Sequence, residues 1–258
     1  MRPEPLLRCR EITVRFGGVT ALADVALDVR PGSITSIIGP NGAGKTTLLG
    51  AITGMVRTAS GSVALAGRDI SARPAHARAR AGIVRTFQNL EVFTNMTVVE
   101  NVMTGCHRHV RYPALAALLR TPRYRREERR CLDHALDRLA FVGLGELADT
   151  PAAELAFGQQ RALELARAVA ANPSLLLLDE PAAGLNMAET RALGALIRRI
   201  RDDLGVTVVL VEHDMDLVMT ISDEIMVLNH GCNLALGTPR QIQKNPEVVR
   251  AYLGDDDL

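Results

Sequence analysis

The sequence lacks tryptophan, and aromatic residues make up only 3% of its 258 residues. Proteins that bind single-stranded nucleic acid without sequence preference stack the bases on aromatic side chains, so this class is poorly supported. Charge gives it no support either, because 30 basic and 29 acidic side chains leave a formal net charge of +1. A chain so close to neutral has no overall attraction for a polyanion.

Cysteines are few, and long apolar runs are missing. The four cysteines, Cys9, Cys106, Cys131 and Cys232, form no CxxC pair and have no histidine at zinc-ligand spacing, so we expect buried or inert thiols in a reducing compartment. The first residues lack the apolar core of a signal peptide, and no stretch of about 18 uncharged apolar residues occurs. The sequence therefore predicts a cytosolic chain that does not span a membrane.

What is present is typical of a single large globular domain. Hydrophobic residues make up 47% and charged residues 23% of the sequence, so a large core can form without disulfides. Short β-branched and apolar runs alternate with helical patterns, which predicts an α/β fold. The expected strands are residues 11–16, 23–29, 33–39, 62–66, 174–179, 206–211 and 224–228. The four leucines Leu175–Leu178 indicate a central strand covered on both faces.

One long stretch shows no strand pattern. Between about Gln88 and Ala171 the pattern is helical, at residues 98–109, 113–119, 123–139 and 160–171. We therefore expect a helical subdomain of about residues 88–171, inserted into a core of about residues 1–87 and 172–258. Residues 120–130 hold six arginines with Glu127 and Glu128. A solvent-facing helix surface is the ordinary interpretation of such a run, and a docking surface is the alternative.

A glycine-rich loop follows the strand expected at residues 33–39 and precedes an apolar helix pattern. It reads GPNGAGKTT, which satisfies the pattern GxxxxGK[ST] of a phosphate-binding loop. Its glycines let backbone N–H groups converge on phosphate oxygens, and the helix N-terminus adds partial positive charge. We expect Lys45 to neutralise the β- and γ-phosphates of ATP and Thr46 to bind Mg²⁺. The predicted ATP-binding residues of this loop are Gly39, Pro40, Asn41, Gly42, Ala43, Gly44, Lys45, Thr46 and Thr47.

Two carboxylates, Asp179 and Glu180, end the leucine strand. The carboxyl edge of a parallel sheet is where ligands bind in open α/β folds, so both should emerge beside the phosphate loop. Adjacent acids suit two tasks. We expect Asp179 to hold Mg²⁺ and Glu180 to act as the general base for the attacking water.

Three further residues give the sequence a family resemblance. Gln88 lies in TFQN, His213 follows the strand expected at residues 206–211, and Phe16 ends the strand expected at residues 11–16. From about residue 6 to residue 254, the chain resembles the ATP-binding subunit of an ATP-binding-cassette (ABC) transporter. The resemblance implies that Gln88 touches Mg²⁺ and the attacking water, that His213 contacts the γ-phosphate, and that Phe16 stacks on adenine. It also implies a P-loop ATPase fold with a mixed or parallel core sheet, an antiparallel β subdomain and an inserted helical subdomain.

The segment Leu155–Gln159 departs from the family pattern. It reads LAFGQ where the family usually has LSGGQ, so Ala156 replaces a serine whose hydroxyl contacts the γ-phosphate bound by the partner protomer. Gly158 and the N-terminus of the following helix can still present backbone N–H groups to that phosphate. We expect Ala156, Gly158 and Gln159 to act in trans on the partner's ATP, and we expect an active enzyme.

Other segments narrow the resemblance. The chain resembles ATP-binding subunits of branched-chain amino acid importers in five segments. They are the aromatic signature, DEPAAGLN at residues 179–186, EHDM at residues 212–215, Gly-Thr-Pro at residues 237–239 and PEVVRAYLG at residues 246–254. ATPases of urea importers are similar and stay open as an alternative. In the family, residues 184–186 lie at the dimer contact.

The resemblance implies partners and a location. This chain would pair with a second copy or with another ABC ATPase, and the pair would sandwich two ATP molecules. Two transmembrane permease subunits would dock against the helical subdomain, and a periplasmic solute-binding protein would act through them; nucleic acid is not a partner. The expected location is the cytoplasmic face of the inner (plasma) membrane, as a peripheral subunit.

Three other functions fit the sequence less well. A soluble ABC ATPase acting on ribosomes or DNA commonly has two cassettes or a long coiled coil, and 258 residues accommodate neither. A non-hydrolytic regulator would lack Glu180 or His213, and both are present. A P-loop kinase would leave Gln88, His213 and the signature segment unexplained.

Overall fold

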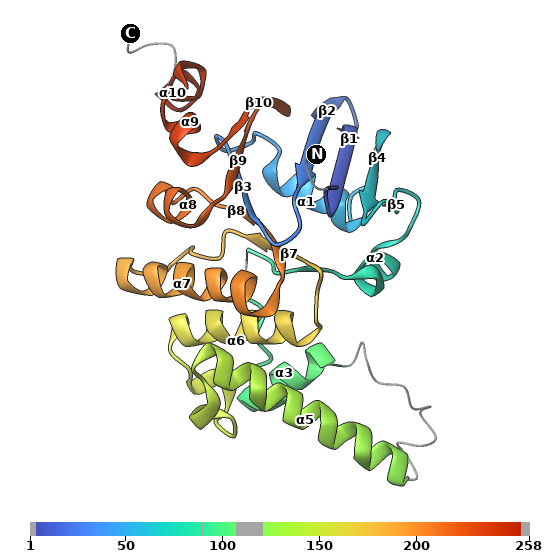
Figure 1. The fold of residues 1–258 in the computed structure, drawn as a ribbon, viewed down its shortest axis with the longest axis vertical. Coiled ribbons are helices and arrows are strands. Elements are labelled where there is room, and N and C mark those ends of the chain that lie inside the picture. The colour runs from blue at the N-terminus through green and yellow to red at the C-terminus, as the bar shows by residue number, and fades with distance from the viewer. Residues whose placement is uncertain (1–3, 89, 107–120, 254–258) are drawn as a thin grey trace. The chain divides into compact units, whose positions relative to one another are not determined.

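The computed structural model describes residues 4–88, 90–106 and 121–253 (Figure 1). Contacts divide the chain into two compact units, Met1–Arg85 with Ser174–Leu258, and Thr86–Pro173. The strands are β1 (Leu7–Phe16), β2 (Val19–Val29), β3 (Ile34–Ile38), β4 (Ser60–Leu65), β5 (Arg68–Asp69), β6 (Ile83–Arg85), β7 (Leu175–Asp179), β8 (Thr207–Val211), β9 (Glu224–Asn229) and β10 (Cys232–Gly237). The helices are α1 (Lys45–Thr53), α2 (Ala75–Ala81), α3 (Val98–Cys106), α5 (Pro122–Val142), α6 (Phe157–Ala170), α7 (Met187–Leu204), α8 (Met215–Ile221), α9 (Pro239–Gln243) and α10 (Pro246–Leu253), with 3₁₀ turns η2 (Gly145–Leu147) and η3 (Ala152–Glu154).

A mixed sheet forms the core of the first unit, in the order β10-β9-β3-β8-β7-β6. Strands β9, β3, β8, β7 and β6 run parallel, and β10 is antiparallel to β9. The leucines of β7 are completely buried, as their unbroken apolar run predicts. The strand is interior but not central, because the short edge strand β6 is its only neighbour on one side.

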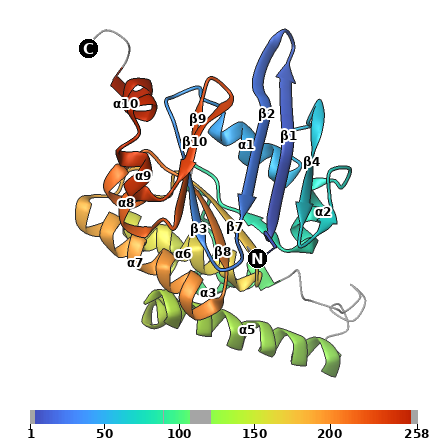
Figure 2. The ribbon, with the colours of Figure 1, turned by 45° about the horizontal axis from the view of Figure 1, so that its top comes forward.

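A second, antiparallel sheet has the order β2-β1-β4-β5 and confirms the expected β subdomain. Its strand β1 alternates: Leu7 and Cys9 are buried while Arg8 and Arg10 are exposed, as the period of two in a half-buried strand requires. Helix α1 contacts both sheets, and its leucines Leu48 and Leu49 belong to one apolar cluster with residues of each. On the opposite face of the mixed sheet lie α7, α8 and α9 (Figure 2).

The second unit is helical, as expected for the inserted segment. Helices α3, α5 and α6 share a core that includes Val102, Leu139 and Leu163. Helix α5 begins at Pro122, because Thr121 accepts a hydrogen bond from the Tyr124 amide (3.3 Å) and proline fits the first helical turn. It ends at Gly143, which adopts a left-handed backbone conformation.

The helices expected in this unit match the structure unevenly. The helix predicted at residues 113–119 and the end of the one predicted at 98–109 lie outside the described residues. Helix α6 begins at Phe157, three residues earlier than the apolar pattern predicts. The early start has a local cause, because the Gln159 side chain accepts a hydrogen bond from the Ala156 amide (2.9 Å) and closes the first turn.

The four thiols are free, but not all are buried. Cys9, Cys106 and Cys131 lie in the interior, and burial raises the pKa of Cys9 to about 12. Cys232 is exposed at the start of the edge strand β10, so burial applies to three of the four thiols that were expected to be buried or inert. Among the residues that the structure describes, no helix is both long and apolar enough to cross a membrane.

Candidate functional site

The phosphate-loop sequence connects β3 to α1 and requires glycine at several positions. Gly39, Gly42 and Gly44 all have positive φ, at 150°, 81° and 99°. A Cβ on Gly39 would lie 2.1 Å from the carbonyl oxygen of Leu228, and one on Gly44 would lie 2.6 Å from the Leu22 side chain. Side chains are therefore excluded where the backbone turns into the N-terminus of α1, and the loop can present its N–H groups.

Lys45 is held inside this loop. Its ammonium donates hydrogen bonds to the carbonyl oxygens of Gly39 (2.7 Å) and Pro40 (3.0 Å). Burial lowers the pKa of Lys45, and the carboxylates of Glu180 and Asp179 oppose that shift. The cation thus lies within the electrostatic reach of both acids predicted for the site.

Asp179 ends β7 close to the first turn of α1. Its Oδ1 lies 3.5 Å from the Thr46 hydroxyl, and its Oδ2 accepts a hydrogen bond from Arg85 at 2.6 Å. The Arg85–Asp179 ion pair is buried on both sides. Arg85 was not among the predicted site residues. The available signal was a charged side chain at the carboxyl end of a short apolar strand, β6.

Glu180 and His213 come together after neighbouring strands. The distance from His213 Nδ1 to Glu180 Oε2 is 3.9 Å. Glu180 has a left-handed backbone, with φ of 48°, and its amide donates to the Val211 carbonyl at 2.9 Å. A non-glycine residue in that region is uncommon and carries strain, so the surrounding structure fixes the direction of this side chain.

Glu212 supports both of these residues and is 1% exposed. Its carboxylate accepts hydrogen bonds from the amides of Ala182 (2.7 Å), His213 (3.0 Å) and Asp214 (3.4 Å). Burial raises the pKa of Glu212, while these backbone donors oppose the shift. Because it ties the turn after β7 to the turn after β8, Glu212 positions Glu180 and His213. Sequence reasoning gave it no role.

Phe16, at the end of β1, is 53% exposed. An aromatic ring left so open at a strand end is available to stack on a planar ligand, since core packing does not occupy it. Asn41 and Gly42, at the tip of the phosphate loop, are exposed as well, whereas Ala43 is buried.

Gln88 and the signature residues belong to the helical unit and are described within it. The Gln88 carbonyl accepts a hydrogen bond from Arg161 at 3.0 Å. Arg161 also pairs with Glu164 at 3.1 Å and lies over the Phe157 ring, 5.6 Å from its centroid. One buried guanidinium thus joins the Gln88 segment to the start of α6, where the other signature residues Ala156, Gly158 and Gln159 lie.

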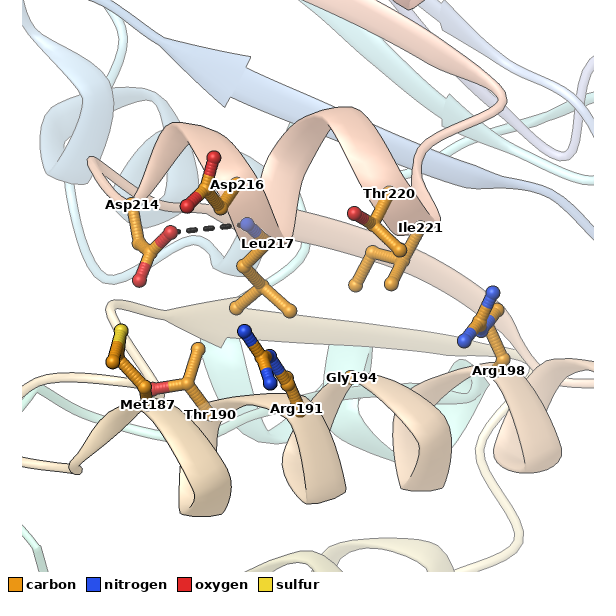
Figure 3. Close-up of a pocket in the computed structure, with 10 residues that line it drawn as sticks. All are labelled: Met187, Thr190, Arg191, Gly194, Arg198, Asp214, Asp216, Leu217, Thr220 and Ile221. Atoms are coloured by element: carbon orange, nitrogen blue, oxygen red, sulfur yellow. Dashed lines mark hydrogen bonds between the residues drawn. The ribbon is translucent and has the colours of Figure 1, made fainter.

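Two cavities of the first unit differ in what lines them. One, of about 790 Å³, is lined by Pro40–Ala43 of the phosphate loop and by Glu247, Arg250 and Ala251 of α10. The other, of about 310 Å³, lies between α7 and α8 (Figure 3). There, Arg191 points from α7 toward α8, and Asp214 caps α8 by accepting from the Leu217 amide. None of the predicted site residues lines this second cavity.

Comparison with known families identifies the family to which the chain belongs. A family model described as "ABC transporter" matches residues 22–183, which is more than half of the chain. The chain belongs to the ABC transporter family. A second family model, described as "Branched-chain amino acid ATP-binding cassette transporter", matches residues 232–257 of this ABC ATPase. That match covers β10, the edge strand of the mixed sheet, and the helices α9 and α10 that follow it.

Curated relatives cover the ABC ATPase almost from end to end. The high-affinity branched-chain amino acid transport ATP-binding protein BraF of Pseudomonas aeruginosa is 49% identical over 97% of this chain and 98% of the relative. Protein LivG of Escherichia coli K12, which bears the same description, is 46% identical over 98% of this chain and 99% of the relative. The zinc import ATP-binding protein ZnuC of Halorhodospira halophila is 36% identical over 98% of this chain and 86% of the relative.

Solved structures agree with this assignment. A nucleotide-free ATP-binding cassette from an ABC transporter superposes with a TM-score of 0.84 at 31% identity, covering 97% of this chain and 100% of the other. The ADP conformation of an ATP-binding cassette gives a TM-score of 0.85 at 32% identity, covering 98% of this chain and 100% of the other. The ABC ATPase is therefore a nucleotide-binding enzyme that hydrolyses ATP, as the sequence predicts.

Proposed function

We propose that this ABC ATPase powers an importer of branched-chain amino acids. The observation that carries the solute assignment is the identity of 49% and 46% to relatives described by that transport, against 36% to a zinc importer subunit. The match of residues 232–257 to a branched-chain family model supports the same choice. None of the three relatives named above is described as a urea importer subunit, the alternative that the sequence left open.

ATP binds, in this proposal, at the carboxyl edge of the mixed sheet. The backbone N–H groups of residues 39 and 41–47 surround the phosphates, and the α1 N-terminus adds its partial positive charge. Lys45 turns its ammonium from the loop carbonyls to the β- and γ-phosphates, and Phe16 stacks on adenine. The proposal is supported by the positive φ angles of the loop and by the exposure of Phe16.

Hydrolysis needs a base beside the γ-phosphate. Glu180 accepts the proton of the attacking water as the water oxygen bonds to the γ-phosphorus, while the bond from that phosphorus to the bridging oxygen breaks and ADP leaves. His213, 3.9 Å from Glu180, donates to the γ-phosphate and orients the base. Glu212 holds both turns through its backbone hydrogen bonds, so it is a positioning residue.

Mg²⁺ is the ion that we propose beside the phosphates. Thr46 and Asp179 offer a hydroxyl and a carboxylate oxygen 3.5 Å apart, and oxygen donors are those that Mg²⁺ prefers. Within the described ranges no group of three or more His, Cys, Asp or Glu could hold a metal. Mg²⁺ needs none, because it is held through one or two carboxylates, phosphates and water. Bound there, with Gln88 as a further ligand, it would neutralise charge on the phosphate oxygens.

The remaining parts of the proposal concern other chains. Ala156, Gly158 and Gln159 complete the site of a partner cassette, which is a second copy or another ABC ATPase. Two permease subunits dock on the helical unit and carry the solute, supplied by a periplasmic binding protein. The ABC ATPase then works at the cytoplasmic face of the inner membrane. The relatives' description as transport ATP-binding proteins supports such partners.

Glu180→Gln tests the hydrolytic site. The amide keeps the size of the side chain but cannot take a proton, so kcat for phosphate release should fall by about 100-fold or more while ATP still binds. Exposed Glu146→Gln is the matched control and should hydrolyse ATP as the unchanged protein does. Turnover that survives Glu180→Gln would overturn the assignment of the base.

The solute is tested in cells. A strain lacking this gene should lose uptake of labelled leucine, isoleucine and valine, and the unchanged gene should restore it. The Lys45→Ala form should not, because it lacks the ammonium of the phosphate loop. Retained uptake of these amino acids together with loss of urea or zinc uptake would refute the branched-chain assignment.

A further inference from the structure

The first half of α5 carries a band of exposed arginines. Arg123, Arg125, Arg126, Arg129 and Arg130 are all exposed, and we name them the arginine stripe. At 3.6 residues per turn these five positions fall within an arc of roughly 160° of the helix circumference. The stripe is therefore one continuous surface rather than a scatter of charges around the helix.

The opposite side of the same turns faces the protein. Tyr124, Glu127 and Glu128 are half-buried, and Cys131 is buried in the core of the helical unit. Arg130 lies 3.5 Å from Glu127, yet its side chain stays 71% exposed. Five arginines against two glutamates leave this stretch strongly positive, and the arginines are on the solvent side.

The position of these arginines lowers the stability of the first turns of α5. The N-terminus of an α-helix carries partial positive charge, so cations in the first turns are unfavourable there, and α5 has no acidic residue in its first turn. Arginines four residues apart, such as Arg125 with Arg129 and Arg126 with Arg130, also repel one another. Local helix stability therefore does not explain the stripe. An anionic surface that covered it would relieve both repulsions.

We propose that the arginine stripe binds the anionic phospholipid headgroups of the membrane beside which the transporter works. This inference rests on the proposed function, which places the chain at a membrane. Guanidinium groups pair with phosphate in a bidentate manner, and clusters of four to eight basic residues near a membrane are typical of binding to anionic lipid.

The shape of the stripe favours a lipid surface over an acidic polypeptide. It is the convex outside of a helix, and neither cavity described above includes it. A flat array of phosphates can meet all five arginines of such a surface at once. On the following turns, the exposed carboxylates of Asp133 and Asp137 end the positive stripe, and Leu132 and Leu136, each 38% exposed, continue one edge of it.

Vesicle sedimentation tests the proposal. The purified full chain is mixed with phosphatidylcholine vesicles that contain or lack phosphatidylglycerol, at low and high KCl. Binding should require phosphatidylglycerol and weaken with salt. Arg125→Gln with Arg129→Gln should lower the partition coefficient by about 30-fold, since each basic residue contributes about fivefold near an anionic surface.

Two controls make the result decisive. Arg191→Gln with Arg198→Gln, on exposed positions of α7, changes the net charge equally and should bind vesicles as the unchanged protein does. Glutamine keeps helix propensity and removes repulsion, so the melting temperature of the stripe variant should not fall. Vesicle binding that ignores phosphatidylglycerol, equal binding by the stripe variant, or capture by polyglutamate but not by vesicles would each overturn the proposal. ATP hydrolysis by the same preparations reports on the proposed function separately.

Discussion

At the scale of single residues, the N-cap of α6 is where this chain departs from its family. Ala156 supplies no side-chain acceptor for the amides of the first turn. The reverse contact is present, because Gln159 accepts from the Ala156 amide at 2.9 Å. Half of a capping box is therefore already formed, and the missing half is an acceptor that a serine would provide.

Ala156→Ser should complete that box. We expect the free energy of unfolding to rise by about 1 kcal/mol, because the hydroxyl accepts from the Gln159 amide. ATP-dependent dimerisation should be retained or strengthened by up to about 1 kcal/mol if the hydroxyl reaches the partner's γ-phosphate. Urea unfolding and light scattering measure the two effects. Ala153→Ser, at an exposed neighbouring position, is the control and should change neither. A turnover reduced more than tenfold would contradict the alignment of Ala156 with the family serine.

Residue types and spacing, with the family resemblance for His213, predicted which groups to examine but not the groups that hold them in place. Asp179, Glu180 and His213 stand at the ends of apolar strands, a position that a pattern reveals. Arg85 and Glu212 act through partners far away in the sequence: Arg85 pairs with Asp179, and Glu212 binds the amide of Ala182. Such contacts depend on which strands become neighbours, and apolar periodicity does not encode the order of strands in a sheet.

At the scale of elements, α6 is tied to the Gln88 segment by a guanidinium that also belongs to a buried ion pair within α6. Arg161 and Glu164 each have side chains 4% exposed and lie 3.1 Å apart. Burial raises the pKa of Glu164, and Arg161 opposes that shift. The pair therefore serves two purposes: Arg161 keeps the buried carboxylate compensated, and its other nitrogen holds the Gln88 carbonyl.

Arg161→Met should cost about 3–5 kcal/mol of unfolding free energy, because it leaves Glu164 buried and unpaired. Without the cation the folded-state pKa of Glu164 rises further, and a raised folded-state pKa means that stability is lost as pH increases through it. The unfolding free energy that Arg161→Met removes, measured with urea, should therefore be larger at pH 8 than at pH 5. Arg161→Met with Glu164→Leu should recover most of the lost stability and a pH dependence close to that of the unchanged protein. The double variant should still hydrolyse ATP slowly, since the contact with Gln88 stays absent. Normal turnover in this double variant would show that the link to Gln88 has no role in hydrolysis.

Strands buried on both faces were predicted best. Strands β7 and β8 lie where apolar runs placed them, and β3 lies where its three isoleucines and the phosphate-binding loop after it placed it. Strands β5 and β6 hold two and three residues, too few for any period, and β10 is a partly exposed edge strand with weak alternation. Such strands form because a neighbouring strand offers free backbone groups, and that depends on tertiary structure.

At the scale of the whole molecule, the proposed site needs residues from both units. Lys45 belongs to the first unit and Gly158 to the second, and the proposal has each serve a γ-phosphate bound between two copies. ATP then shifts the equilibrium toward a pair by the difference between its affinity for the pair and for the single chain. Removal of the γ-phosphate by hydrolysis reverses the shift.

The Glu180→Gln chain should be monomeric without nucleotide and dimeric with ATP and Mg²⁺, because slow hydrolysis preserves the γ-phosphate contact. Light scattering gives the mass directly. Addition of Lys45→Ala to the same chain should keep it monomeric, since the phosphate loop then lacks its cation. A mass that stays monomeric when ATP is bound at one molecule per chain would count against the paired site.

Helix α10 has a practical consequence for handling the protein. It contributes to the cavity beside Pro40–Ala43, and burial raises the pKa of Tyr252 while the Gly39 backbone opposes that shift. An affinity tag fused to the C-terminus would start only a few residues after this contact. Purification from an N-terminal tag, removed by protease before nucleotide titrations, keeps foreign sequence away from the loop whose affinity is being measured.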